Sequence, residues 1–242
     1  MAQPRGLVSR SIQPLVALRA MRTLLSDPDD TAQVFRIVRA LSGGSFERYY
    51  QRTLADPSGA RILDERRDIL PVLQDRERLR ALPEGTLGRE YARFLDDEGL
   101  SPDGLVEAST EEEDATEFLD ERAHVFSRRL RDTHDLWHIA AGYHRDLFGE
   151  ASLLAFTYAQ GLNHGIGFIV LMAMVKHWME GHGELFALIR QGFRRGRRAE
   201  SFICADWEAL LELPLAEVRR RLKVEDVPNY TPHFSSAALA MR

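Results

Sequence analysis

Apolar side chains recur at intervals of three and four residues along most of this chain, and glycine and proline clusters separate the runs. One example, between the turns at 27–30 and 43–44, consists of Val34, Ile37, Val38 and Leu41. This spacing places apolar side chains on one face of an α-helix. The chain shows no sustained alternation of apolar and polar residues, the pattern typical of β-strands. We therefore predict an all-α fold, a multi-helix bundle with a central apolar helix.

All 242 residues are assigned to one domain whose two ends differ from the rest. Residues 1–26 contain four arginines and no acid, a composition typical of a transit or membrane-surface segment. A peripheral amphipathic helix explains the same residues and is the interpretation we favour; its apolar positions would be Leu15, Leu18, Met21 and Leu25. Residues 228–242 are expected to form an irregular tail.

Composition excludes several classes of protein. With 44% hydrophobic and 29% charged residues, the chain has the composition of a soluble globular protein. Its net charge of −5 gives no general case for nucleic-acid binding. Because Cys204 is the only cysteine, an intrachain disulfide is impossible, and we expect a buried thiol in a reducing compartment.

The residues with the clearest chemical meaning lie between 131 and 150. His134 and His138 are four residues apart, so a helix would project both imidazoles from one face. Asp135 lies about 100° round the helix from His134, and a continuous helix would carry Glu150 about 120° away from His138. The helix should therefore break, with Gly142 and Gly149 as candidate break points. Glu150 would then open a second helix that packs back against the first.

Two imidazoles and one or two carboxylates form a nitrogen-and-oxygen site. Such a site suits zinc or another divalent first-row metal and leaves a coordination position for water or substrate. The alternative is that the histidine pair is structural, as in many amphipathic helices. The spacing also differs by one position from the H-E-x-x-H motif of zinc proteases, so the general-base role of that glutamate does not carry over.

The least polar part of the chain is 151–179, and its apolar core, 165–175, is too short to span a bilayer. We expect it to form the central core helix. An alternative is that Gly161, Gly165 and Gly167 leave space for a long apolar ligand.

Three charged stretches each have two interpretations. Residues 185–200 alternate apolar and basic side chains, which fits either an anionic membrane surface or a solvated helix face. The acidic run at 111–114 fits the first turn of a helix, or else a binding site for a partner. Arg128, Arg129 and Arg131, just before the histidine pair, could neutralise an acidic substrate or lie on a solvated face.

The segment from His134 to Glu150 fits H-D-x-x-H-(x)11-E and resembles the signature of the coenzyme Q (ubiquinone) biosynthesis protein 4 family. Further matches lie at 82–95 and 206–219, and the resemblance extends from about residue 25 to 222. An ordered set of three matches is far more specific than H-D-x-x-H alone.

The resemblance implies a metal-dependent enzyme of ubiquinone synthesis, an oxidative decarboxylase, hydroxylase or lyase. It would replace the C1 carboxylate of a 4-hydroxy-3-polyprenylbenzoate-type intermediate with a hydroxyl. The implied metal is zinc, with iron or manganese as alternatives, and its ligands would be His134, His138 and Glu150. Asp135 would be a further ligand or would orient an imidazole, and all four residues are candidate catalytic residues.

The expected partners are a polyprenylated ring intermediate, the membrane surface and other ubiquinone-biosynthesis proteins, with a homodimer as a further expectation and no nucleic acid. The protein would lie at the inner membrane, on the cytoplasmic side in a bacterium or the matrix side in a mitochondrion. The main rival function is a non-catalytic, lipid-binding scaffold that organises the pathway enzymes around a structural metal. A metal-dependent hydrolase is a weaker alternative.

Overall fold

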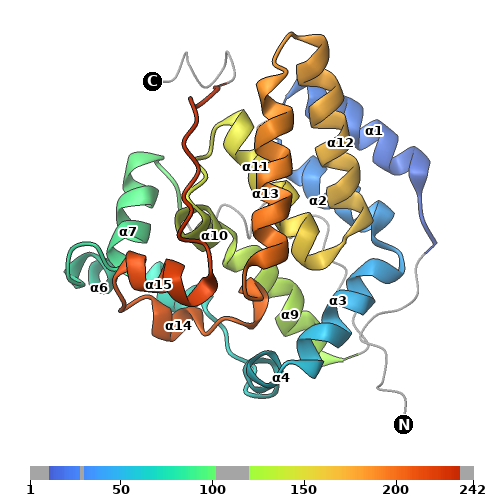
Figure 1. The fold of residues 1–242 in the computed structure, drawn as a ribbon. Helices are drawn as coiled ribbons and strands as arrows, with labels where there is room; N and C mark the ends of the chain where they lie inside the picture. The colour runs from blue at the N-terminus through green and yellow to red at the C-terminus, as the bar shows by residue number, and fades with distance from the viewer. Residues whose placement is uncertain (1–10, 28–29, 102–119, 235–242) are drawn as a thin grey trace.

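Helices make up nearly all of the regular structure in the computed structural model, which describes residues 11–27, 30–101 and 120–234 (Figure 1). Within these ranges there is no β-strand, and an isolated bridge pairs Thr86 with Pro214. The all-α prediction is confirmed. The helices are α1 (Pro14–Ser26), α2 (Thr31–Ser42), α3 (Gly44–Ala55), α4 (Pro57–Asp64), α5 (Leu70–Gln74), α6 (Arg76–Ala81), α7 (Leu87–Asp97), α9 (Glu121–Asp132), α10 (His134–Ala141), α11 (Leu147–Gly161), α12 (His164–Met179), α13 (Glu184–Arg198), α14 (Trp207–Leu210) and α15 (Leu215–Leu222), with a 3-10 turn η2 (Phe202–Cys204).

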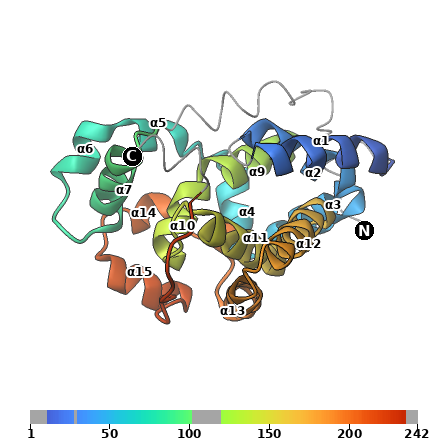
Figure 2. The same cartoon turned by 90° about the horizontal axis from the view of Figure 1, so that it is seen from above.

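Helix α11 lies at the centre of the bundle and contacts α3, α10, α12 and α13. Figure 2 shows α5, α6 and α7 with α14 and α15 at one side of the molecule and α1 and α2 at the other, with α10 and α11 between them. The largest apolar cluster joins α10 and α11 to α3, α7, α9 and the C-terminal helices. Its largest fully buried aromatic side chains are Tyr50, Tyr91, Phe126, Trp137, Tyr143, Phe156, Phe202 and Trp207.

Two glycines on α13 allow that helix to approach α11 closely. A Cβ atom at Gly192 would overlap the carbonyl oxygen of Ser152, and one at Gly196 would overlap that of Phe156. The two glycines are four residues apart and therefore lie on the same face of α13. Here α13 meets the backbone of α11 directly.

The apolar stretch 151–179 is two helices, so the expectation of one core helix is wrong for 165–175. Leu162, with φ at 53°, ends α11, and the Asn163 side chain caps α12 by accepting hydrogen bonds from two backbone N–H groups. The central apolar helix is α11. Helix α12 buries one face and exposes large apolar side chains on the other: Leu171, Val175, Trp178 and Met179.

Protein atoms fill the space beside the three glycines of this stretch. A Cβ at Gly161 would lie 2.8 Å from the Tyr49 ring, one at Gly165 would lie 2.5 Å from Cα of Val38, and one at Gly167 would lie 2.8 Å from the Tyr158 ring. These glycines serve close packing. The expectation that they leave a channel for a long ligand is therefore wrong at these positions.

The N-terminal helix α1 forms, but its buried face differs from the predicted one. Ala17, Ala20, Met21 and Leu24 are buried against α2 and α12, whereas Leu15 and Leu18 are exposed. Small alanines allow α1 to lie close to α2, and a pattern of large apolar residues does not detect them. Residues 1–10 lie outside the described ranges.

Most predicted turns coincide with helix ends. Gly43 ends α2, and Pro214 separates α14 from α15. Asp56 starts α4, because its side chain accepts hydrogen bonds from the N–H groups of Ser58 and Gly59. Residues 228–234 are irregular as expected, and the acidic run 111–114 lies outside the described residues. No helix in the described ranges has the length and apolar character needed to cross a membrane.

Candidate metal centre

The histidine pair lies on α10, a helix of two turns whose start is fixed by Thr133. The hydroxyl of Thr133 donates to the carbonyl of Arg129 on α9 and accepts a hydrogen bond from Nε1 of Trp137. These two bonds join the end of α9 to the start of α10. His134 and His138 then project from successive turns of α10, as the four-residue spacing predicts.

Gly142 ends α10 in the left-handed conformation, with φ at 74° and ψ at 31°. Glycine adopts this conformation without the steric cost that a Cβ imposes. Its N–H and that of Tyr143 both donate to the carbonyl of His138. The predicted break at Gly142 is confirmed. The prediction of a second break at Gly149 is wrong, because Gly149 lies inside α11, which begins at Leu147.

Asp146 starts α11 and so sets the position of Glu150. Its side chain accepts hydrogen bonds from the N–H groups of Phe148 and Gly149, 3.0 Å and 3.3 Å away. Glu150 lies in the first turn of α11, where a negative charge is favoured by the helix dipole. The prediction that Glu150 opens a second helix packed against the first is therefore correct.

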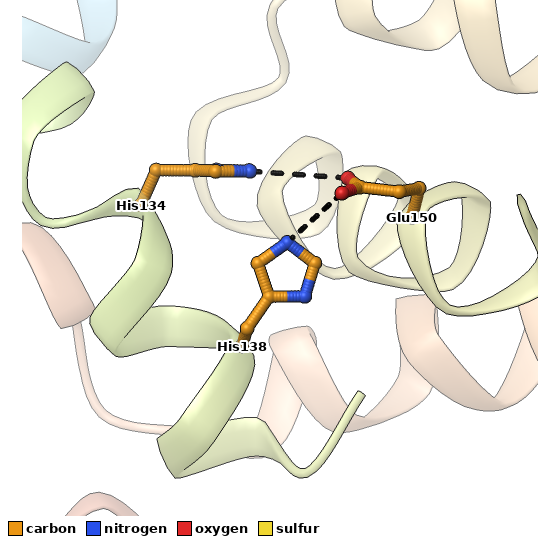
Figure 3. Close-up of side chains that lie close together, drawn as sticks. All are labelled: His134, His138 and Glu150. Atoms are coloured by element: carbon orange, nitrogen blue, oxygen red, sulfur yellow. Dashed lines mark ion pairs between the residues drawn. The ribbon is translucent and has the colours of Figure 1, made fainter. Parts of the chain in front are cut away.

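The three predicted ligands converge on one point (Figure 3). Nε2 of His138 lies 3.3 Å from Oε1 of Glu150, and Nε2 of His134 lies 3.9 Å from Oε2. The two imidazole rings are perpendicular, with centroids 4.9 Å apart. Ligand atoms of all three residues lie within 4.8 Å of one another, so one ion between them can contact all three.

The hydrogen bonding of His138 shows which of its nitrogens is available to an ion. Nδ1 donates to the carbonyl of Tyr143, 3.0 Å away, which leaves the lone pair of the neutral ring on Nε2. Nε2 is fully buried and has no hydrogen-bond partner in the structure. A buried polar atom without a partner is costly unless a proton or cation satisfies it. A divalent cation bound by Glu150 would satisfy it, so the residues fit a metal.

The close contact between His138 and Glu150 also shifts the pKa values of both side chains. Burial disfavours charge on His138, but the carboxylate of Glu150 outweighs it and raises the pKa of the imidazole. Burial likewise favours the neutral form of Glu150, yet the two imidazoles hold its pKa well below the usual range. Glu150 is therefore ionised at neutral pH and attracts a cation.

Asp135 is not part of this group of three. It is buried on α10, and its charge adds to the effects that raise the pKa of His138. This proximity fits a residue that supports the imidazole. Its role, either as ligand or in orienting an imidazole, stays a prediction.

Arg145 is a site residue that the sequence patterns did not identify. Its Nε lies 3.5 Å from Oε1 of Glu150, and about a third of its side chain is exposed. The turn between α10 and α11 carries Arg145 back to the site. An exposed cation beside the three ligands can attract an anionic substrate.

The expectation that the arginines before the histidine pair neutralise a substrate or lie on a solvated face is wrong for Arg129 and Arg131, whereas Arg128 is about a third exposed and lies 3.9 Å from Asp68. Arg129 is buried, and its guanidinium forms two 2.8 Å hydrogen bonds with Glu208. Arg131 is buried beside Asp132, 2.7 Å away. Arg129 thereby joins α9 to α14.

Comparison with known proteins identifies the family of this chain. The sequence profile of the coenzyme Q (ubiquinone) biosynthesis protein Coq4 family matches residues 9–228. The chain belongs to this family. The matched segment includes every helix described above and all three residues of the candidate metal centre.

Curated relatives include mitochondrial proteins of fungi named as ubiquinone biosynthesis protein COQ4. This Coq4-family chain is 31% identical over 199 residues to that of Scheffersomyces stipitis, an alignment covering 75% of this chain and 55% of the relative. It is 33% identical to that of Aspergillus niger (73% and 58% covered) and 30% identical to that of Clavispora lusitaniae (84% and 62%). The chain thus spans less than two thirds of the length of these relatives.

A solved structure shares the fold. The crystal structure of a Nostoc punctiforme PCC 73102 protein, named as a candidate ubiquinone biosynthesis protein, superposes with a TM-score of 0.65. The superposition covers 88% of this Coq4-family chain and 99% of the other. At 24% identity, the likeness shows the fold alone.

Proposed function

We propose that this chain is a metal-dependent enzyme of ubiquinone synthesis that replaces the C1 carboxylate of a 4-hydroxy-3-polyprenylbenzoate-type intermediate with a hydroxyl. The observation that carries the proposal is the convergence of His134, His138 and Glu150, in which the buried Nε2 of His138 forms no hydrogen bond and lies 3.3 Å from Oε1 of Glu150. Membership in a family named for ubiquinone biosynthesis supplies the substrate class. With water as the source of the oxygen atom, the exchange releases carbon dioxide, two protons and two electrons, and a separate two-electron acceptor such as dioxygen must take up the electrons.

The side chains divide the work between holding an ion and binding the substrate. His134, His138 and Glu150 would hold a divalent metal, with zinc as the first candidate and iron or manganese as alternatives. When bound, such an ion polarises an aromatic acid through an open coordination position. Arg145, at the exposed edge of the site, would attract the substrate carboxylate and orient it toward the ligands.

The enzyme proposal is tested by substituting a ligand and measuring metal and lipid together. In cells that depend on this protein, His138→Ala should remove the metal and cause a carboxylated, prenylated precursor to accumulate. The matched control is His164→Ala, because His164 is an exposed histidine at the start of α12, away from the site. A folded His138→Ala protein that loses its metal without changing the precursor pool would favour the scaffold over the enzyme.

We also propose that the tip of the α12–α13 hairpin contacts a membrane surface, as a substrate with a polyprenyl tail requires. Trp178 and Met179 at the end of α12 are 75% and 79% exposed, and Phe186 on α13 is 60% exposed. Arg190 and Arg194 follow Phe186 along α13 and are also exposed. Exposed aromatic residues next to cations are typical of surfaces that bind anionic bilayers.

Vesicle sedimentation tests this contact. Replacing Trp178, Met179 and Phe186 together by serine should weaken binding to anionic vesicles at least tenfold. Leu162→Ser is the control, because Leu162 is also an exposed apolar residue but lies just before the N-terminus of α12, away from the hairpin tip. This variant should bind anionic vesicles as the wild type does. Wild-type protein that stays in the supernatant would contradict the proposal, and dimers that dissociate in the triple variant would assign the face to a second copy of the chain.

A further inference from the structure

The irregular segment 227–234, called here the C-terminal strap, runs beside α10 and α11 after the last helix (Figure 1). It meets α11 at Asp146, the residue that caps this helix. Asp146 is 1% exposed, and both of its carboxylate oxygens accept hydrogen bonds from the strap. Oδ2 accepts from the hydroxyl of Tyr230, 2.7 Å away, and Oδ1 accepts from the N–H of His233, 2.8 Å away.

Further bonds connect the strap to the turn between α10 and α11. The N–H of Leu147 donates to the carbonyl of His233, 2.8 Å away, and the N–H of His144 donates to the hydroxyl of Tyr230, 3.0 Å away. The His233 ring stacks on Phe148 with centroids 4.6 Å apart and an angle of 17°. The strap therefore holds both the turn and the first residues of α11.

The strap also lies directly against the backbone next to Glu150. A Cβ atom on Gly149 would come within 2.5 Å of the Tyr230 hydroxyl oxygen, so glycine is needed for this approach. The N–H of Glu150 donates to the carbonyl of Asp146, 2.8 Å away. A shift of Asp146 thus moves the backbone of Glu150, whose carboxylate must meet two imidazoles on another helix.

We infer that the C-terminal strap is a positioning element for the metal centre: Tyr230, acting through Asp146, fixes the start of α11 so that Glu150 faces His134 and His138. The inference rests on the proposed metal site. The residues involved, Tyr230 and His233, lie beyond residue 228, where the match to the Coq4 family ends. Groups that hydrogen-bond directly to metal ligands typically change metal affinity 10- to 100-fold when removed, and because Tyr230 acts one contact further away we expect the lower end of this range.

Tyr230→Phe removes only the hydroxyl, and zinc is the probe. Competition against a chromophoric chelator should show the dissociation constant of the full chain for zinc rising about tenfold. With cobalt in place of zinc, the visible spectrum should change in position or intensity, because it reports ligand geometry. His233→Ala, which keeps the backbone bonds to Asp146 and Leu147 and removes only the ring, should have a smaller effect.

Tyr50→Phe is a closely matched control. The Tyr50 hydroxyl donates to Asp120, 2.8 Å away, and Asp120 caps α9 as Asp146 caps α11. Both variants lose a tyrosine–aspartate bond at a helix start, so both should lower the melting temperature of the metal-free protein. We expect only Tyr230→Phe to weaken zinc binding, with Tyr50→Phe within twofold of wild type.

Each outcome separates this inference from the function on which it rests. Wild-type protein that binds no zinc or other divalent metal would remove the metal centre itself. Wild type that binds zinc, with Tyr230→Phe binding equally well and giving the same cobalt spectrum, would make the strap a purely structural contact. Equal losses of affinity in Tyr230→Phe and Tyr50→Phe would trace the effect to general destabilisation, which also overturns the inference.

Discussion

Nε2 of His138 lies 3.3 Å from Oε1 of Glu150, while Nδ1 of the same ring donates to the carbonyl of Tyr143. In the neutral ring, a nitrogen lone pair and a carboxylate oxygen therefore face each other in a buried site. Two acceptors repel unless a proton or cation lies between them. The arrangement favours metal binding, because an ion replaces this repulsion with two attractive contacts.

Metal binding should therefore stabilise the folded protein. Zinc at about 100 times its dissociation constant contributes about 2.7 kcal/mol to the free energy of unfolding. For a chain of this size, that corresponds to a rise in melting temperature of about 5–10 °C. Differential scanning calorimetry with zinc and with a chelator measures the difference.

Substitution of Glu150 tests whether the stabilisation comes from this site. Glu150→Gln keeps the shape of the side chain but removes its charge, so the response to zinc should largely disappear. His164→Ala should keep the full response. If Glu150→Gln is stabilised by zinc as much as wild type, the ion binds elsewhere.

Arg145 should act on metal and substrate in opposite directions. Its guanidinium lies 3.5 Å from Glu150, and therefore repels any cation bound there. Arg145→Gln should tighten zinc binding by up to about tenfold, since the side chain is partly exposed and screened. The same change should weaken binding of an aromatic carboxylate such as 4-hydroxybenzoate. Zinc competition at low and high salt is the measurement, and an effect independent of salt would argue against a charge interaction.

The sequence predicted the convergence of His134, His138 and Glu150 well because two local rules determine it. A four-residue spacing on a helix places His134 beside His138, and a glycine with positive φ at 142 reverses the chain. The reason for a glycine at position 149 could not be predicted from local rules. It is glycine because the His144 carbonyl and the Tyr230 hydroxyl approach its backbone, and Tyr230 is 81 residues away in the chain.

Contacts between residues far apart in the sequence also explain where the predicted fold was wrong. Helix α12 is apolar on nearly all sides, which predicted a core position, yet Trp178 and Met179 are exposed. A pattern of apolar residues shows that a face needs a partner, but it does not show whether that partner belongs to the chain. Glycines at 161, 165 and 167 likewise pointed to empty space, where aromatic rings and a neighbouring backbone fill it.

Asp206 should make the stability of the C-terminal helices depend on pH in the acid range. It caps α14, and its Oδ2 lies 2.8 Å from Arg67 and 3.2 Å from Arg61. Burial favours its neutral form, but hydrogen bonds from Arg67 and from the N–H of Ala209, together with the charges of Arg67 and Arg61, outweigh burial and lower the pKa of Asp206. A lowered pKa adds stability above the unfolded-state value of about 3.9, and this stability is lost as pH falls through the folded-state pKa.

Asp206→Asn isolates the charge of this residue, because asparagine caps helices about as well as aspartate. Urea unfolding at pH 7 should show a loss of roughly 1 kcal/mol relative to wild type. The two proteins should converge in stability as the pH is lowered below about 4. A difference that stays constant down to pH 3 would show that the ionised carboxylate is not the cause.

The close approach of α13 to α11 predicts where the central bundle tolerates no added atom. A methyl group at Gly192 would overlap the carbonyl oxygen of Ser152, a backbone atom that cannot move without displacing α11. Gly192→Ala should therefore lower the free energy of unfolding by about 1–3 kcal/mol, although alanine is the better helix former. Because α11 also carries Glu150, the displacement should reach the metal centre and weaken zinc binding.

Gly183→Ala is the control for this substitution. Gly183 precedes α13, has φ at −64°, and has open space where a Cβ would be placed. Alanine there should change the free energy of unfolding by less than about 0.5 kcal/mol and leave zinc affinity unchanged. If both alanine variants unfold at the same urea concentration as wild type, α11 and α13 are separated by more than the structure shows. The direct backbone contact that holds α11, the helix of Glu150, against α13 would then be absent.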